Sequence, residues 1–172
     1  MSVSIRKPLY WTLLSYDGWR VHIAAVDEGL CFVGSHNQSI NELTEWADRR
    51  MPGCDLLRDD HMMKPYEDEL RRYFAGDLEQ FTLPVYYQGT PFQTSVWRSL
   101  CEIPYGQTRS YSDIANDIQK PSSVRAVGTA IGANPILITV PCHRVIGKNG
   151  SLTGYRGGME MKKKLLELER TI

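Results

Sequence analysis

Short apolar runs separated by tight turns occupy the first 35 residues of the chain. The runs cover residues 9–15, 19–26 and 30–33, and Asp17-Gly18 separates the first two. Asp-Gly between two such runs is a strong hairpin signal, because both residues tolerate the positive φ angles of a two-residue turn. The pattern therefore predicts a small antiparallel sheet near the N-terminus.

Two helices are predicted after these strands. Ser39-Ile40-Asn41-Glu42 has the form of a capping box, in which a serine and an acidic residue three positions later satisfy each other's backbone donors. Residues 51–63 have the composition of a loop. Pro65 is then expected at the first position of a second helix over residues 66–75, where the missing N–H of proline costs nothing.

The chain after residue 84 is mainly helical by the same criteria. Thr90-Pro91-Phe92-Gln93 combines an N-cap, a first-position proline and a capping-box glutamine. Ser110 is expected to cap one short helix, and Ser122 or Ser123 to start another, since serine is a favoured N-cap. Two short helices joined by a tight turn predict a helix-turn-helix.

The last part of the chain combines a buried apolar run, a glycine-rich segment and a final helix. Residues 136–140 are expected to form a buried strand, residues 154–158 are rich in glycine, and residues 159–170 have helical periodicity. Glu167 and Glu169 in this helix are, from residue type alone, expected at the surface. The helix also carries three consecutive lysines that are expected to form a solvated face: Lys162, Lys163 and Lys164.

Charge divides the chain into two unlike halves. Lys plus Arg (20) balances Asp plus Glu (20) over the whole sequence, but residues 1–84 hold 9 basic and 14 acidic residues, whereas residues 85–172 hold 11 and 6. A polyanion would be attracted to the second half. We expect an α+β fold with two domains: residues 1–84, a structural α/β domain with an antiparallel sheet, and residues 85–172, a mainly helical domain containing the helix-turn-helix.

Metal centres and membrane spans find little support in the sequence. The longest apolar run near the N-terminus, residues 9–14, is far below the roughly 20 residues that a membrane span requires. No CxxC pair or zinc-type Cys/His spacing occurs, and we expect no cofactor, no membrane association and a cytoplasmic protein (nuclear in a eukaryote). The cysteines are widely separated: Cys31, Cys54, Cys101 and Cys142.

Cys142 and His143 are candidates for nucleophilic chemistry. A thiol becomes a useful nucleophile when an imidazole takes its proton or when a positive group such as Arg144 favours the thiolate. Neighbouring side chains on an extended backbone point apart, so the two residues can cooperate only at a sharp turn or through a bridging water. The alternative is that Cys142 is a small buried hydrophobic residue, as most cysteines are.

The second helix of the expected helix-turn-helix carries Arg125 among small residues such as Ala126. Such a helix can approach a DNA groove closely, and equally it can pack on another helix with Arg125 solvated. Ser110 and Tyr111 begin the preceding helix and are placed to meet a phosphate, with Tyr111 as a core residue the alternative. Trp97, at helical spacing from Phe92, is expected in the core rather than in a base-stacking platform.

At Pro141-Cys142-His143-Arg144-Val145 the chain resembles the O6-alkylguanine-DNA alkyltransferases, also called methylated-DNA–protein-cysteine methyltransferases. The resemblance covers about residues 66–169, while the first 65 residues match poorly. Leu137 stands where some relatives have a proline that lines the pocket, which leaves the preferred lesion size open. The other familial motifs are Tyr73-Phe74-Ala75-Gly76, Gly89-Thr90-Pro91-Phe92-Gln93, Val96-Trp97, Ile103-Pro104-Tyr105-Gly106, Ser110-Tyr111, Arg125-Ala126-Val127-Gly128, Asn134-Pro135 and Gly154-Tyr155-Arg156-Gly157-Gly158.

The resemblance implies repair of DNA by direct reversal of damage. An alkyl group would pass irreversibly, once per molecule, from O6-alkylguanine to Cys142, with O4-alkylthymine as an open second substrate. His143 would activate the thiol through water, Glu169 would orient the imidazole, and Asn134 would brace the turn.

The resemblance also assigns DNA and base contacts. Arg125 would fill the space of the flipped nucleotide while Tyr111 presses on the adjacent phosphate, because the lesion is hidden in the stacked duplex. The partner would be double-stranded DNA with alkylated bases, bound through the minor groove by a monomer. Ser110 and Ala126 belong to the same DNA-binding surface, and the base pocket would comprise Val145, Tyr155, Arg156 and Gly157.

Two other classes of function remain open on the sequence. A binding module would recognise alkylated DNA without repairing it, and Cys142 argues against this because a recogniser needs no acceptor. A helix-turn-helix regulator would have no chemistry, and the chain lacks an evident sensor domain.

Overall fold

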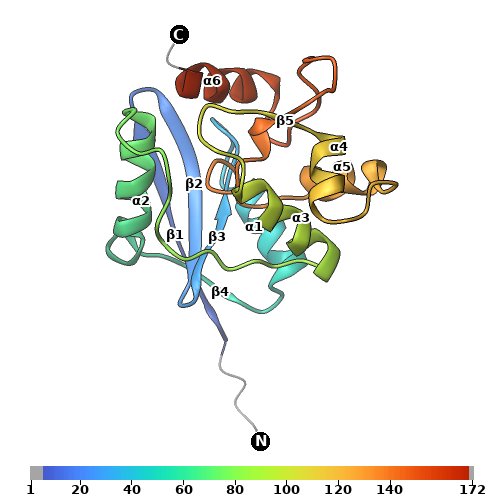
Figure 1. The fold of residues 1–172 in the computed structure, drawn as a ribbon. Coiled ribbons are helices and arrows are strands. Elements are labelled where there is room, and N and C mark those ends of the chain that lie inside the picture. The colour runs from blue at the N-terminus through green and yellow to red at the C-terminus, as the bar shows by residue number, and fades with distance from the viewer. Residues whose placement is uncertain (1–5, 171–172) are drawn as a thin grey trace, which may run out of the picture. The chain divides into compact units, whose positions relative to one another are not determined.

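The computed structural model describes residues 6–170, and the chain divides into two compact units, Met1–Tyr86 and Tyr87–Ile172. The domain boundary expected from the sequence lies between residues 84 and 85, close to this division. Figure 1 follows the elements of both units along the chain from blue to red. No helix in the described range is long and apolar enough to cross a membrane.

The first unit is built on a four-stranded sheet with strand order β3-β2-β1-β4. Asp17 and Gly18 have φ angles of 45° and 85°, so the expected hairpin turn between β1 and β2 is confirmed. The mixed α+β class is confirmed as well. The strands are β1 (Pro8–Tyr16), β2 (Trp19–Val26), β3 (Gly29–Val33) and β4 (Asp55–Arg58).

Strand β4 corrects the expectation of a loop over residues 51–63 and of a wholly antiparallel sheet. It pairs in parallel with β1, with Pro8 opposite Asp55 and Trp11 opposite Arg58. A strand of four residues with only two apolar side chains is too short to produce a periodic signal. It becomes a strand because β1 offers it a free edge.

Helices α1 (Asn41–Arg50) and α2 (Asp60–Phe74) complete this unit. α1 packs on the face of the sheet that carries Leu9. Thr12 is three residues further along β1, so its side chain points to the other face. There its hydroxyl donates to the carboxylate of Asp60 in α2 at 2.7 Å. The two helices therefore cover opposite faces of the sheet (Figure 1).

The starts of both helices differ from expectation. Glu42 does not close a capping box; its carboxylate instead accepts hydrogen bonds from the N–H and the hydroxyl of Ser35 at 2.7 and 2.6 Å. α2 begins at Asp60, with the Asp59 side chain accepting from the N–H of Met62 at 2.9 Å, and Pro65 lies inside the helix. Pro65 stands in the second turn of the helix, where its missing N–H removes one backbone hydrogen bond.

The second unit contains four α-helices in its described part: α3 (Pro91–Cys101), α4 (Tyr111–Asp117), α5 (Val124–Gly132) and α6 (Met159–Arg170). Thr90 and Ser110 both form capping boxes, with Gln93 and Asp113 respectively. Helices α4 and α5 pack against each other, as expected for the helix-turn-helix. The N-cap of α5 is Ser123.

Residues 136–140 form a buried turn instead of the expected strand. The N–H of Val140 donates to the carbonyl of Ile136 at 3.1 Å, and Ile138 has a φ angle of 68°. A buried apolar run has the same composition in a strand and in a packed turn, so periodicity does not distinguish them. In this unit β5 (Arg109–Ser110) and β6 (Val145–Ile146) pair in parallel.

Candidate active site

Cys142 begins a single 3-10 turn, η1 (Cys142–Arg144), directly after Pro141. Its side chain is buried, yet it lines a pocket of about 590 Å³. The sharp turn satisfies the condition under which Cys142 and its neighbour His143 can act together. The pocket is lined by Tyr111, Gly128, Ile131, Gly132, Cys142, Thr153, Gly154, Tyr155 and Arg156.

Asn134 braces the turn and also contacts the thiol. Its Nδ2 lies 3.3 Å from Sγ of Cys142 and donates to the carbonyl of Val140 at 3.1 Å and of Ile136 at 3.2 Å. Its Oδ1 accepts from the N–H of Ile136 at 2.9 Å. Asn134 is fully buried, so this network fixes the position of Sγ without competition from solvent.

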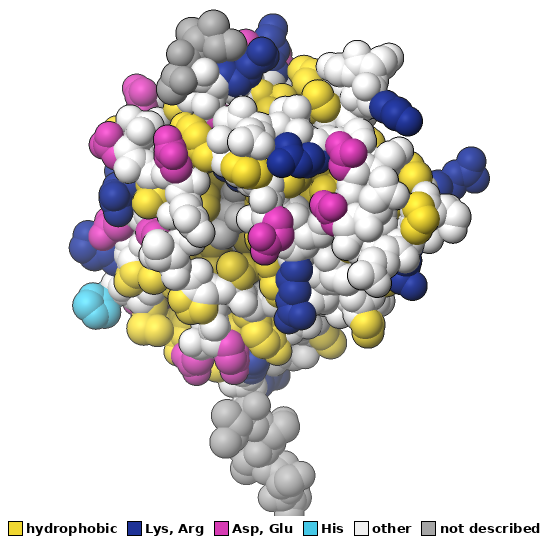
Figure 2. All heavy atoms as spheres, in the orientation of Figure 1, with side chains coloured by type: hydrophobic (Ala, Val, Ile, Leu, Met, Phe, Trp, Pro, Cys, Tyr) yellow, Lys and Arg dark blue, Asp and Glu magenta, His cyan; other side chains and the backbone are white. Residues whose placement is uncertain are grey.

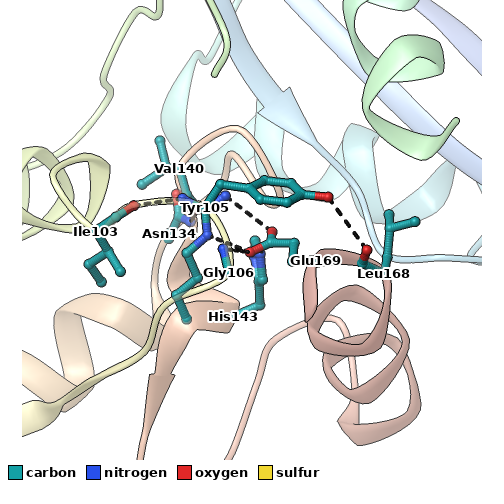
Figure 3. Close-up of polar contacts among 9 residues, drawn as sticks. Ile103, Tyr105, Gly106, Asn134, Val140, His143, Leu168 and Glu169 are labelled. Carbon is teal, nitrogen blue, oxygen red and sulfur yellow. Dashed lines mark hydrogen bonds and ion pairs between the residues drawn. The ribbon is translucent and has the colours of Figure 1, made fainter. Parts of the chain in front are cut away.

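His143 and Glu169 form a buried pair next to the cysteine. Nε2 of His143 lies 2.5 Å from Oε2 of Glu169, and the N–H of Gly106 donates to the same carboxylate at 3.3 Å. Figure 3 shows the Glu169 carboxylate between Gly106 and His143. The expectation from residue type that Glu169 lies at the surface is wrong, whereas the position implied by the resemblance is the one observed.

Burial lowers the pKa of His143 more than the hydrogen bond to Glu169 raises it. The imidazole is therefore neutral near pH 7 and donates Nε2–H to the carboxylate. The other nitrogen, Nδ1, is buried and has no hydrogen-bonding partner among residues 6–170. A buried ring nitrogen without a partner calls for an explanation, and here it is available as a proton acceptor.

Arg144 was expected beside the thiol of Cys142, but its guanidinium is bonded to Glu169 instead. Its Nε and Nη2 donate to the two oxygens of Glu169 at 2.8 and 3.1 Å, and its Nη1 donates to the carbonyl of Ile103 at 2.7 Å. The guanidinium also lies over the ring of Tyr105, 5.7 Å from its centroid. Arg144 therefore compensates the buried negative charge of Glu169.

Lys162 is the residue that sequence reasoning missed. It is fully buried, and its Nζ donates to the carbonyls of Val145 at 2.7 Å and of Thr153 at 3.1 Å. The expected solvated face is correct only for Lys163 and Lys164, which are exposed. A helical signal existed, because Lys162 shares its face with the buried residues three, four and seven positions later in the helix.

The glycine-rich segment forms one wall of the pocket. Tyr155 and Arg156 line it, whereas Val145 is buried, does not line the pocket, and accepts a hydrogen bond from Nζ of Lys162 at its carbonyl. Gly157 has no room for a side chain, since a Cβ there would lie 2.5 Å from Sδ of Met161. Of the four expected pocket residues, Tyr155 and Arg156 therefore line the pocket, whereas Val145 and Gly157 do not.

The environment of the thiol contains opposing influences. Burial raises the pKa of Cys142, while the hydrogen bond from Asn134 and the positive charges of Arg156 and Lys162 lower it. The thiol is therefore protonated at rest, and the groups around it are arranged to favour the thiolate.

The expected DNA-binding residues lie on α4 and α5. Arg125 and Ala126 are exposed and line a second hollow of about 670 Å³ that does not include Cys142. The hydroxyl of Tyr111 lies 2.6 Å from Oγ1 of Thr153, and the hydroxyl of Ser110 accepts from a backbone N–H as the cap of α4. Both hollows are lined by α5, so this helix separates Arg125 from the acceptor pocket.

Acidic and basic side chains are interspersed on the face drawn in Figure 2. No group of three or more His, Cys, Asp or Glu residues within 6–170 is placed to hold a metal ion.

The family models match both units. Residues 9–87 match the 6-O-methylguanine DNA methyltransferase ribonuclease-like domain, and residues 91–171 match the DNA binding domain of the same family. The inducible methylated-DNA–protein-cysteine methyltransferase of Bacillus subtilis is 64% identical over 165 residues, covering 95% of this chain and 92% of that protein. The similarity thus extends through the first 65 residues, contrary to the sequence analysis.

Solved structures give the same result. The O6-methylguanine methyltransferase of Mycobacterium tuberculosis superposes with a TM-score of 0.80 at 38% identity, over 95% of this chain and 93% of that one. The M. tuberculosis protein OGT in complex with DNA superposes with a TM-score of 0.81 at 39% identity, over 94% and 93% of the two chains.

Proposed function

Because the chain belongs to the 6-O-methylguanine DNA methyltransferase family, we propose that it repairs DNA by moving the alkyl group of O6-alkylguanine onto Sγ of Cys142. The observation that carries this proposal is the position of Cys142. A buried thiol lines a pocket, receives a hydrogen bond from Asn134, and is followed in sequence by an imidazole already bound to Glu169.

Proton removal from the thiol is the first step. Nδ1 of His143 accepts the proton through a water molecule, while Nε2 stays on Glu169. Developing positive charge on the imidazole is stabilised by the adjacent carboxylate. Arg144 holds that carboxylate in place, so that it orients the ring and does not itself take the proton.

Alkyl transfer follows by displacement at carbon. The Sγ–C bond forms while the C–O6 bond breaks, and the electron pair of that bond passes to the purine. The guanine anion then takes up a proton at N1, in net terms the one that His143 removed from the thiol. The product is a thioether. No group in the described pocket is suited to cleave this bond, and each molecule therefore reacts once.

Nucleotide flipping is needed because O6 is inside the stacked duplex. We propose that Arg125 occupies the vacated space from the minor groove and that the monomer uses α5 for close approach. Ala126 is small and exposed, so its face of the helix can come close to the groove. The ring of Tyr111 lies beside Gly128. We propose that it presses on the phosphate adjacent to the extruded nucleotide.

Transfer from a labelled duplex tests this function. A duplex with radiolabelled O6-methylguanine should label the wild-type protein and the Cys101→Ser variant, whose cysteine lies elsewhere in the same unit. Cys142→Ser should bind the duplex and acquire no label. Label on the Cys142→Ser variant, or binding by the wild type without any transfer, contradicts the proposal.

A further inference from the structure

Arg156 connects the glycine-rich segment to the turn that follows α5. Its Nε donates to the carbonyl of Asn134 at 2.9 Å, and its Nη2 donates to the carbonyl of Pro135 at 3.3 Å. The guanidinium therefore contacts two consecutive carbonyls through two different nitrogens held in one plane, a geometry that the single nitrogen of a lysine does not reproduce.

The anchor point of Arg156 is also the residue that holds the thiol. The backbone of Asn134 receives the guanidinium, and the side chain of Asn134 contacts Sγ of Cys142 at 3.3 Å. Arg156 and Cys142 line the same pocket. One cationic side chain thus lies in the wall of the pocket that holds the acceptor atom, and it is bonded to the residue that positions that atom.

The segment itself has little rigidity of its own. Three of residues 154–158 are glycines, and glycine has the widest backbone freedom. Gly158 uses that freedom, with a φ angle of 94°. A side-chain anchor is therefore needed to hold Tyr155, which belongs to this segment, in the pocket wall.

We propose that Arg156 is a positioning residue for alkyl transfer, which docks the Tyr155-bearing segment onto the Asn134 turn and keeps a positive charge beside Sγ of Cys142. The inference rests on the proposed function. The attacking sulfur carries negative charge before the Sγ–C bond forms, and O6 of guanine gains negative charge as the C–O6 bond breaks. A fixed cation in the pocket stabilises charge of this sign.

Other ionisable groups face the same thiol and must be separated from Arg156. Lys162 acts from α6 but is held by two backbone carbonyls, and His143 is adjacent in η1 with Glu169 and Arg144 behind it. The hydroxyls of Tyr111 and Tyr155 belong to pocket residues. A substitution at Arg156 removes none of these groups, so its effect reports the loss of the guanidinium, both its charge and the docking of the Tyr155 segment that it provides.

The test compares Arg156→Gln, Arg156→Lys and the control Lys163→Gln, which removes one positive charge from an exposed site on α6. Single-turnover transfer from free O6-benzylguanine is followed across pH, since the free base has no phosphates. Arg156→Gln should raise the midpoint of the rate profile by about one pH unit, or about tenfold in rate below the midpoint. Arg156→Lys, which keeps the charge without the fork, should shift it less, and Lys163→Gln should match the wild type.

Two results would overturn the proposal. A wild-type midpoint and rate for Arg156→Gln on the free base, with loss only on duplex DNA, would make Arg156 a phosphate contact. Circular dichroism shows whether Arg156→Gln folds. If it does not, the inference is tested with Arg156→Lys alone, and an unshifted pH profile for that variant contradicts it. Alkylation of Cys142 by iodoacetamide, followed by peptide mapping across pH, reports the same shift without transfer, so that a failure of the proposed function is recognised separately.

Discussion

Glu169 and His143 are joined by a buried hydrogen bond of 2.5 Å, although 26 residues separate them in the sequence. Arg144 binds both oxygens of the same carboxylate, so the negative charge is compensated while the bond to the imidazole persists. The pair gives an oriented neutral base beside Cys142. This relationship connects the final helix directly to the acceptor site.

Glu169→Gln should slow alkyl transfer by on the order of 10²-fold. The carboxylate raises the pKa of His143 against the effect of burial, so its removal lowers that pKa further and weakens the base. The weaker imidazole takes the thiol proton less readily, so the apparent pKa of Cys142 should rise and the pH profile of single-turnover transfer should move to higher pH. Glu167→Gln, an exposed carboxylate on the same helix, is the matched control, and equal behaviour of both variants would show that Glu169 has no part in proton transfer.

Arg125→Ala should weaken repair of duplex DNA while leaving the reaction with free O6-benzylguanine nearly normal. Arg125 is exposed on α5 and does not line the acceptor pocket, so its loss affects extrusion of the nucleotide and not the thiol. Arg98→Ala, an exposed arginine on α3, controls for the loss of one positive charge. Equal losses on both substrates would reject the role of Arg125 in flipping.

Lys162→Met should lower the free energy of unfolding by about 1–3 kcal/mol, because buried carbonyls lose their donor. The carbonyls are those of Val145 and Thr153, and Met fills most of the volume of the lysine stem. Lys163→Met on the exposed side should change stability by less than about 0.5 kcal/mol. Urea denaturation measures both, and equal midpoints would mean that the buried ammonium contributes nothing to stability.

Local capping signals made much of the fold predictable. Thr90, Ser110 and the Asp17-Gly18 turn act through hydrogen bonds and φ angles within a few residues, so their pattern alone predicts the structure that they form. Pro65 misled because the stronger start signal, Asp59, precedes it. The capping box predicted at Ser39 does not form, because the carboxylate of Glu42 accepts its hydrogen bonds from Ser35 instead.

The candidate site was predictable mainly through the resemblance. From residue types alone, Glu169 and Lys162 belong at the surface, and only their pairing with groups far along the chain makes burial favourable. Arg144 was expected beside the thiol because it is close in sequence, yet it turns to Glu169. The helical period places Lys162 and Glu169 on the buried face of the last helix, but it does not show which distant groups satisfy them.

The stoichiometry of transfer tests the central claim most directly. Wild-type protein is titrated with duplex containing O6-methylguanine, without added metal or cofactor, and both products are examined by mass spectrometry. The account predicts at most one methyl group per protein molecule, located on the peptide that contains Cys142, with intact guanine left in the strand and no further reaction. Repeated turnover, or release of a free base from the DNA, would contradict it.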